Sequence, residues 1–224
     1  MTHTAGSRRH RTILGIPAWI VKTVPIVVVV VLAAFSVTVV STAQANKDNS
    51  TDAFNASTYA QKTYESKIVP AVIRDAVDLA TLLTGLDTDA AATEKKYGHT
   101  SGANSPYSFS VTTTGVAGAV NKGLLPLTVE GIAKPYTVFV QIGPEINGTA
   151  LRDATGLVSF GQFVNQIDYQ NAALALNDQV KEKVLKGLDP AALVGKTVTV
   201  TGAYATSVNP GFIGIVPIAI ETAP

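Results

Sequence analysis

His99 is the residue of this sequence best suited to acid–base chemistry. The chain has three histidines, and two of them, His3 and His10, lie in a basic N-terminal stretch. His99 follows a predicted helix and precedes a predicted strand, where a loop presents its imidazole to a ligand or lets it act as a general base. A loop histidine more commonly caps a helix or hydrogen-bonds to a neighbour. Because His99 is the only histidine after the N-terminal stretch, a zinc site built from several histidines of the exported part is excluded.

Charged side chains gather at a second position, a glycine-punctuated junction between a predicted strand and a helix at 142–156. The residues concerned are Glu145, Arg152, Asp153 and, a little further on, Asp168. They offer paired carboxylates or a clamp for an anion, because such junctions expose backbone N–H groups. Solvated ion pairs and helix caps account for the same residues more simply.

Amide side chains and one aromatic ring follow this junction closely. They are Gln162, Asn165, Gln166, Tyr169, Gln170 and Asn171. Amides donate and accept hydrogen bonds at once, so this set is suited to binding a sugar or a polar peptide. An ordinary exposed helix face carries the same residue types.

The sequence excludes several other kinds of functional site. The chain has no cysteine, which removes disulfides, thiolate metal sites, a thiol nucleophile and a lipid-modified cysteine. Gly195-Lys196-Thr197 resembles the end of a phosphate-binding loop, but Pro190 stands where that loop requires glycine, and a strand follows. No Gly-x-Ser-x-Gly element marks a serine hydrolase. We expect no catalytic residue set, no metal and no cofactor.

The first 45 residues form a membrane-targeting segment, either a signal peptide or a signal anchor. A basic cluster precedes Ile26–Val40, which is uncharged throughout, so the N-terminus is expected to stay in the cytoplasm. The run of about 15 residues matches a signal-peptide core, and Ala43-Gln44-Ala45 supplies a cleavage pattern. A tilted helix over residues 24–45 is also long enough to attach the protein to the membrane. Both alternatives stay open.

The remaining chain divides into a polar tether at 46–52 and an exported α+β domain at 53–224. The 17 Lys and Arg include four in the targeting segment, which leaves 13 against 16 Asp and Glu and gives the exported part a net charge of −3. Nucleic acid requires many cationic contacts, so we expect no nucleic-acid partner.

Two helices are predicted at the start of the domain. In the first, apolar residues recur every three or four positions; they are Val69, Val72, Ile73, Ala76, Ala80 and Leu83. Pro70 is expected in its first turn or at a kink, and Gly85 at its end. The second helix covers 90–97, with Asp87 or Thr88 as its cap and Gly98 as its stop.

Alternating apolar residues predict five strands. They cover 107–112, 124–130, 136–142, 196–204 and 212–221. Pro217 indicates an edge or a bulge in the last strand. Helical patterns occupy 149–187 between the third and fourth strands, where Ser159 and Gln162 have capping-box spacing, and Asp189 caps one more turn.

This order of elements predicts the five-stranded antiparallel barrel called the OB-fold. One helix precedes the barrel, a helical insertion separates its third and fourth strands, and the N-terminal hydrophobic helix comes before both. An open antiparallel sheet covered on one face by helices is the alternative.

Several strings of residues carry a family resemblance. They are SKIVPAV near residue 66, KYGH at 96, SPYSF at 105, IGPEINGTALRDATGLVSFGQFVNQIDY from 142, LNDQV at 176 and LVGKTVTVTGAY from 193. Together they resemble the bacterial family of predicted periplasmic lipoproteins of unknown function. The resemblance implies an envelope location on the extracytoplasmic face of the cytoplasmic membrane. Genes of that family often lie beside sugar ABC transporter genes, which implies an accessory role in carbohydrate uptake. This chain has no cysteine to carry the lipid anchor that the family resemblance implies, so a retained helix would replace that anchor.

The leading hypothesis is a non-enzymatic accessory or binding module that works with a sugar transporter or its solute-binding protein. One alternative is a glycan-acting hydrolase or lyase that uses His99 with Asp153 or Glu145, and another is an oligomeric scaffold. The matching strings contain the residues that we select as a candidate ligand site. They are Tyr97, His99, Tyr107, Arg152, Asp153, Gln162, Asn165 and Gln166.

Overall fold

The alternating apolar segments form the strands around which the structure is built. The computed structural model describes residues 54–132, 135–207 and 209–222. The long strands are β3 (Ser108–Ala117), β4 (Leu124–Val129), β5 (Thr137–Gln141), β6 (Thr197–Ala205) and β7 (Phe212–Thr222). Their positions agree with the five predicted strands, although β3 extends to Ala117, well beyond the predicted end.

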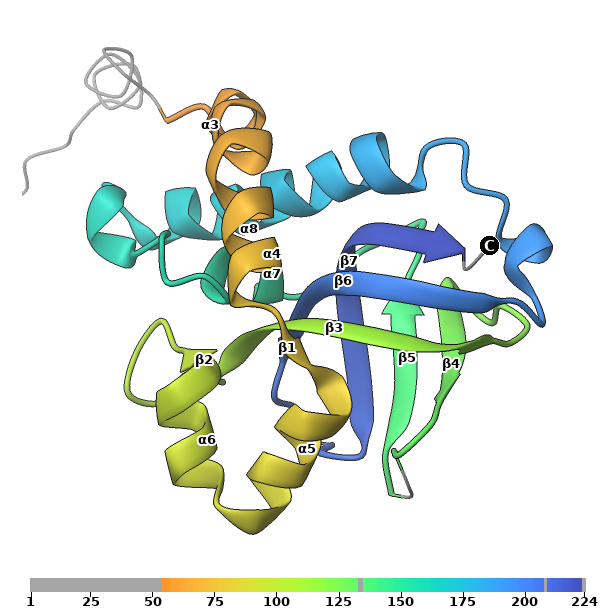
Figure 1. Cartoon of the computed structure of the whole chain (residues 1–224). Coiled ribbons are helices and arrows are strands. Elements are labelled where there is room, and N and C mark those ends of the chain that lie inside the picture. The colour runs from red at the N-terminus through yellow and green to blue at the C-terminus, as the bar shows by residue number, and fades with distance from the viewer. Residues whose placement is uncertain (1–53, 133–134, 208, 223–224) are drawn as a thin grey trace, which may run out of the picture. The chain divides into compact units, whose positions relative to one another are not determined.

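These strands close into a five-stranded barrel (Figure 1). β3 pairs antiparallel with β4 and β6, β4 with β5, and β6 with β7. The remaining pairing, between β5 and β7, is parallel. Two short strands, β1 (Val77–Asp78) and β2 (Gly98–His99), pair with β3 outside the barrel. The closed barrel replaces the open sheet that the sequence left as an alternative.

The first of two hydrophobic cores fills the barrel. Phe109, Leu125, Val140 and Ile215 are among its fully buried side chains. Helix α5 (Leu79–Thr88) packs against the same core with its buried leucines, and Asp78 caps it by accepting a hydrogen bond from the backbone N–H of Thr81. Helix α6 (Ala90–Tyr97) follows and ends at Gly98, as the sequence predicts.

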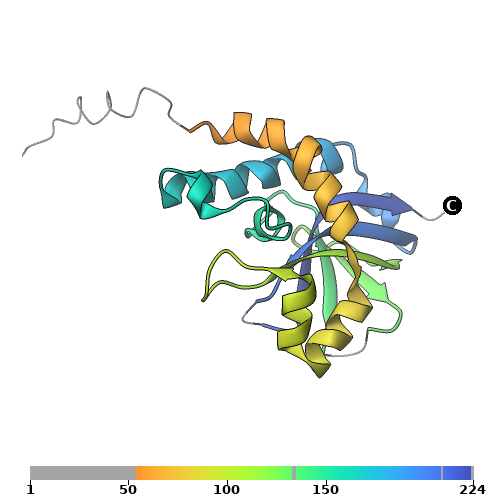
Figure 2. The same ribbon diagram turned by 60° about the vertical axis from the view of Figure 1, so that its left-hand side comes forward.

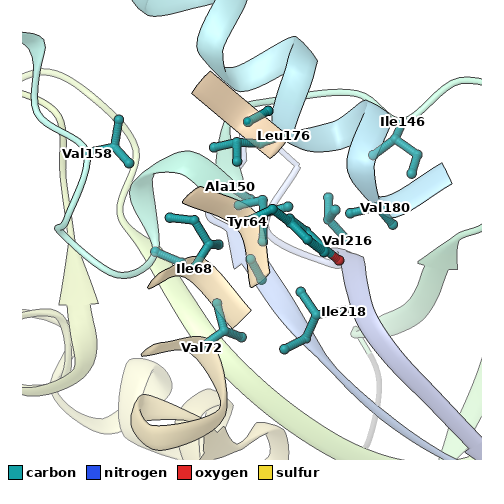
Figure 3. Close-up of a cluster of buried hydrophobic side chains, with 14 of the residues drawn as sticks. Tyr64, Ile68, Val72, Ile146, Ala150, Val158, Leu176, Val180, Val216 and Ile218 are labelled. Carbon is teal, nitrogen blue, oxygen red and sulfur yellow. The ribbon is translucent and has the colours of Figure 1, made fainter. Parts of the chain in front are cut away.

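The second core lies between helices and the outer surface of β6 and β7. Its helices are α3 (Ala56–Thr63), the π-helical η1 (Tyr64–Ile68), α4 (Val69–Asp75), α7 (Ala150–Asp153), α8 (Gln166–Val180) and the π-helical η3 (Lys181–Leu185). Figure 3 shows Tyr64 at the centre of this core, with Leu176 of α8 and Val216 of β7 around it. The helical layer therefore covers only part of the barrel wall.

The helical predictions require three corrections. The helix predicted from Val69 to Leu83 is interrupted, because Ala76 is extended and β1 intervenes; Ile73, assigned to its buried stripe, is 59% exposed. Gly85 does not end a helix but lies inside α5 against Thr93. Asp89, rather than Asp87 or Thr88, caps α6.

The insertion departs from the prediction at one cap and follows it elsewhere. Ser159 forms no side-chain cap, and Asn165 caps α8 by accepting from the backbone N–H of Asp168. The short 3₁₀ helices η2 (Phe160–Gln162) and η4 (Pro190–Leu193) flank α8 and η3, and Asp189 caps η4 as predicted. The register of β6 and β7 shifts next to Pro217, which confirms the predicted bulge.

The predicted targeting segment at 1–45, including the hydrophobic helix at 24–45, and the tether at 46–52 lie outside the described residues. Within 54–132, 135–207 and 209–222, no helix has both the length and the hydropathy needed to cross a bilayer.

Candidate functional site

Arg152 and Asp153, two of the predicted site residues, form a buried ion pair on α7. Their residues are only 4% and 6% exposed. The guanidinium donates from Nε to Asp153 Oδ1 at 2.7 Å and from Nη2 to Oδ2 at 3.0 Å. This bidentate arrangement uses both carboxylate oxygens.

Tyr169 of α8 completes the cluster. Its backbone carbonyl accepts from Arg152 Nη1 at 3.1 Å, and its hydroxyl donates to Asp153 Oδ1 at 3.1 Å. The guanidinium carbon lies 3.5 Å from the centre of the Tyr169 ring, a close cation–π contact. Burial, and then the negative charge of Asp153, raises the pKa of the Tyr169 hydroxyl.

The geometry of this cluster points to a structural role. Each charge is neutralised by the other, and the groups that would meet a ligand are bonded within the cluster. The pair links α7 to α8 across 17 positions of sequence, so it fixes the start of the helical insertion. Both oxygens of Asp153, the residue considered as an acid or base, accept from Arg152.

His99 lies beside the end of α7, away from the barrel interior. A Cβ added to Gly156 would stand 2.6 Å from His99 Nδ1, so the imidazole packs directly on this glycine, whose φ is +66°. His99 itself is exposed, on the short strand β2. The structure thus brings His99 to the segment that follows Arg152 and Asp153.

The two predicted tyrosines lie elsewhere. Tyr97 and Tyr107 are partly buried against the core of the barrel. The Tyr107 ring lies 6.5 Å from that of Phe109, and its backbone bonds to Thr206. These contacts give both rings a packing role.

The three predicted amides are exposed, and two of them are used locally. Gln162 donates to the Leu157 carbonyl at 2.9 Å. Asn165 caps α8 and also donates to the Asp168 carboxylate at 3.0 Å. Gln166 begins α8 with its side chain in solvent.

A neutral hollow of about 290 Å³ opens where the barrel wall emerges from beneath the helical layer. It is lined by Pro106, Gln141, Asn147, Gly148, Thr149, Ala150, Ala205, Thr206, Ser207, Phe212 and Gly214. None of these residues is charged, and they supply two amides, hydroxyls, backbone groups and one aromatic ring. This mixture of apolar surface with a few convergent polar groups is typical of small-ligand sites. We call it the neutral hollow.

An aromatic pair and a glycine shape one wall of the neutral hollow. The Phe212 ring stacks on Phe139 with centroids 5.0 Å apart and planes 24° apart. A Cβ on Gly214 would lie 2.9 Å from Phe212 Cε1, so only glycine lets this ring lie against the backbone of β7. These contacts therefore hold the Phe212 ring in one orientation.

The opposite wall is fixed by hydrogen bonds. Gln141 at the end of β5 accepts from the Asn147 N–H at 2.8 Å and donates to its carbonyl at 3.3 Å. From α8, Asn177 donates to the carbonyls of Ile146 at 3.3 Å and Gly148 at 3.0 Å. These bonds hold the segment 146–150 over the strands.

A larger hollow of about 760 Å³ lies along α3 and the end of α8, but its chemistry is different. Its lining includes Asp178, Lys181, Glu182 and Lys183. Lys181 pairs with Asp178 at 2.6 Å, and Lys183 pairs with Glu65 at 2.9 Å. Exposed charges that pair with each other and with water give little specificity, so the neutral hollow is the better candidate.

The neutral hollow was not predicted from the sequence because its residues come from five separate segments. One signal was available. The centre of β5 is apolar on both faces, which leaves Phe139 on the outer surface of the barrel without an assigned partner.

The fold and the family can now be stated. The chain is an OB-fold protein: it is similar to the crystal structure of an OB-fold protein from Thermotoga maritima, with a TM-score of 0.63, 21% identity, and coverage of 77% of this chain and 100% of that one. The family profile described as "Predicted periplasmic lipoprotein (DUF2291)" matches residues 27–221, and the chain belongs to this family. No curated protein matches it. The family description confirms the predicted resemblance and the extracytoplasmic, membrane-associated location.

Proposed function

We propose that this protein is a non-enzymatic binding module of the bacterial envelope, which binds a small neutral sugar in the neutral hollow. The observation that carries the proposal is the hollow itself. Its lining is uncharged, contains an aromatic ring held by stacking, and presents amide and hydroxyl groups. Hydroxyls of a neutral sugar exchange hydrogen bonds with such groups without leaving a buried charge unpaired.

The proposal extends to a partner. The resemblance to a family encoded beside sugar ABC transporters supports an accessory role with a transporter or its solute-binding protein. A hollow of about 290 Å³ is near the lower limit of small-ligand pockets, roughly 300 to 1,000 Å³. It therefore suits a single sugar ring better than a long glycan chain.

Isothermal titration calorimetry of the full chain in mild detergent tests the ligand. The probes are glucose, galactose, xylose, ribose and maltose. Phe212→Ala removes the stacked ring and should abolish the binding seen with wild type. Phe160→Ala, an exposed aromatic outside the hollow, is the matched control and should bind normally.

Two results would count against the ligand proposal. One is the absence of binding to any probe, and the other is equal binding by wild type and Phe212→Ala. The partner is tested separately by affinity purification from detergent extracts with mass spectrometry. Repeated failure to recover transporter components or a solute-binding protein would refute that part.

A further inference from the structure

An apolar edge lies at the start of α8, on a surface that the neutral hollow does not use. It consists of Leu157, Phe160, Val164 and Ile167, which are all exposed although large and hydrophobic. Val164 is 92% exposed and Ile167 72%. The four residues lie within eleven consecutive positions, and exposed apolar patches commonly mark interaction sites.

The edge also lacks charge. From Ala154 to Ile167 the sequence contains no acidic or basic residue, and the first charge is that of Asp168. Amides stand between the apolar side chains, at Gln162, Asn165 and Gln166. Apolar side chains with uncharged polar neighbours match the boundary between lipid headgroups and acyl chains.

The position of the apolar edge in the domain indicates what the edge contacts. The described domain begins at Phe54, whose ring lies 5.1 Å from that of Phe163 in an edge-to-face contact. Phe163 is the direct neighbour of Val164. The start of α3 and the start of α8 therefore lie together at one end of the helical layer (Figures 1 and 2).

The length of chain before Phe54 limits how far Phe54 can lie from the predicted targeting segment. Thirteen residues separate the uncharged run, which ends at Val40, from Phe54. At about 3.5 Å per residue they span no more than about 45 Å when fully extended. A chain attached to the membrane through that run holds the Phe54 end of the domain near the lipid.

We infer that the apolar edge inserts into the surface of the lipid bilayer and orients the domain on the membrane. Val164 and Ile167 are the most exposed large hydrophobic residues of the described chain, so they suit a fluid lipid surface better than a shaped protein partner. Four apolar side chains bind a bilayer weakly alone, but the tether raises their effective concentration at the surface. The inference does not depend on ligand binding in the neutral hollow.

The absence of cysteine in the chain gives a direct test. Full-length Val164→Cys carrying the fluorophore NBD is reconstituted into vesicles of phosphatidylethanolamine and phosphatidylglycerol. Insertion predicts a blue-shifted emission and quenching by lipids that carry a nitroxide on the acyl chain. Glu130→Cys, exposed in the turn after β4, is the matched control and should show neither effect.

A second comparison distinguishes insertion of the apolar edge from nonspecific adsorption of the protein to lipid. Adding Ile167→Asp to the labelled Val164→Cys protein should remove the quenching, because a carboxylate opposes insertion into lipid. Adding Ile73→Asp, at an exposed apolar residue of α4 outside the edge, should leave it unchanged. Since all these positions are exposed, circular dichroism should show the same fold in every variant.

Other occupants give different results, and each overturns the inference. Quenching no greater at Val164 than at Glu130 excludes lipid insertion. A blue shift that appears only with added envelope proteins, without lipid quenching, assigns the edge to a protein partner. Cross-linking between two Val164→Cys chains, again without lipid quenching, assigns it to a second copy of this chain.

Discussion

The buried pair of Arg152 and Asp153 gives the sharpest prediction about stability. Asp153→Leu leaves the guanidinium of Arg152 buried without its counter-ion. Removing one partner of a buried ion pair costs about 3–5 kcal/mol, because the remaining charge is uncompensated. The hydroxyl of Tyr169 also loses the oxygen to which it donates. We expect the single variant to lose about 3–5 kcal/mol of the roughly 5–15 kcal/mol that stabilises an ordinary domain.

The double variant Arg152→Met with Asp153→Leu should recover most of this loss. It replaces both charges with apolar side chains in a site where each residue is nearly inaccessible to water. Replacing a whole buried pair is commonly neutral or favourable, because neither charge has to be desolvated on folding. The two substitutions should therefore be strongly non-additive.

Urea unfolding of the full chain in mild detergent, followed by far-ultraviolet circular dichroism, measures these differences. Arg74 and Asp75 provide an internal control, since they form the same pair of adjacent residues with bidentate bonds, but on the surface. Asp75→Leu should change the unfolding midpoint little, because an exposed pair gains little in water. An equally small effect of Asp153→Leu would refute the structural role, and it would reopen the cluster as a ligand site.

Three further predictions concern single residues. Gly195→Ala should cost about 1–2 kcal/mol, because Gly195 has a left-handed backbone and open space around the added Cβ. Gly156→Ala should cost more, because its added Cβ also meets the His99 ring. The excess should vanish with His99→Ala in a double-mutant cycle of urea unfolding, and an excess that survives would contradict the contact. Tyr64→Phe should keep or raise the unfolding free energy, because among the residues that the structure describes its buried hydroxyl has no hydrogen-bond partner; a large drop in the urea midpoint would reveal one. Burial raises the pKa of Tyr204 to about 12, so between about pH 10 and pH 12 its hydroxyl keeps its proton in the folded state and loses it in the unfolded state. Stability should fall between about pH 10 and pH 12 by about 1.4 kcal/mol per pH unit for this group, and Tyr204→Phe should make the fall less steep in unfolding measured across that range.

Much of the fold was predictable because it rests on local patterns. The alternation at 196–204 produced β6, and the proline at 217 produced the bulge in β7, since proline cannot donate to the ladder. The number and order of the strands then favoured the OB-fold. The break at Ala76 was not predictable, because Val69 to Leu83 keeps a helical spacing through a residue that the structure makes extended to form β1.

The candidate sites were less predictable, because burial and proximity depend on long-range packing. Arg152 and Asp153 have the sequence of a surface ion pair, and only the packing of α7 against α8 makes them buried. Gln141 and Phe212 stand 71 positions apart and line one hollow because β5 and β7 pair in parallel.

By itself, the sequence predicted the five strands and the family resemblance and fixed the net charge of residues 46–224. Each of these depends on residue type and spacing along the chain. The tertiary structure alone decided which outer faces stay uncovered. The helical layer covers the outer faces of Val216 and Ile218 but leaves Phe212 and Gly214 at the hollow, although all four residues lie on one strand. The pattern of residue types along a segment predicts the helix or strand that the segment forms. The exposure of each residue depends instead on the elements that pack against it.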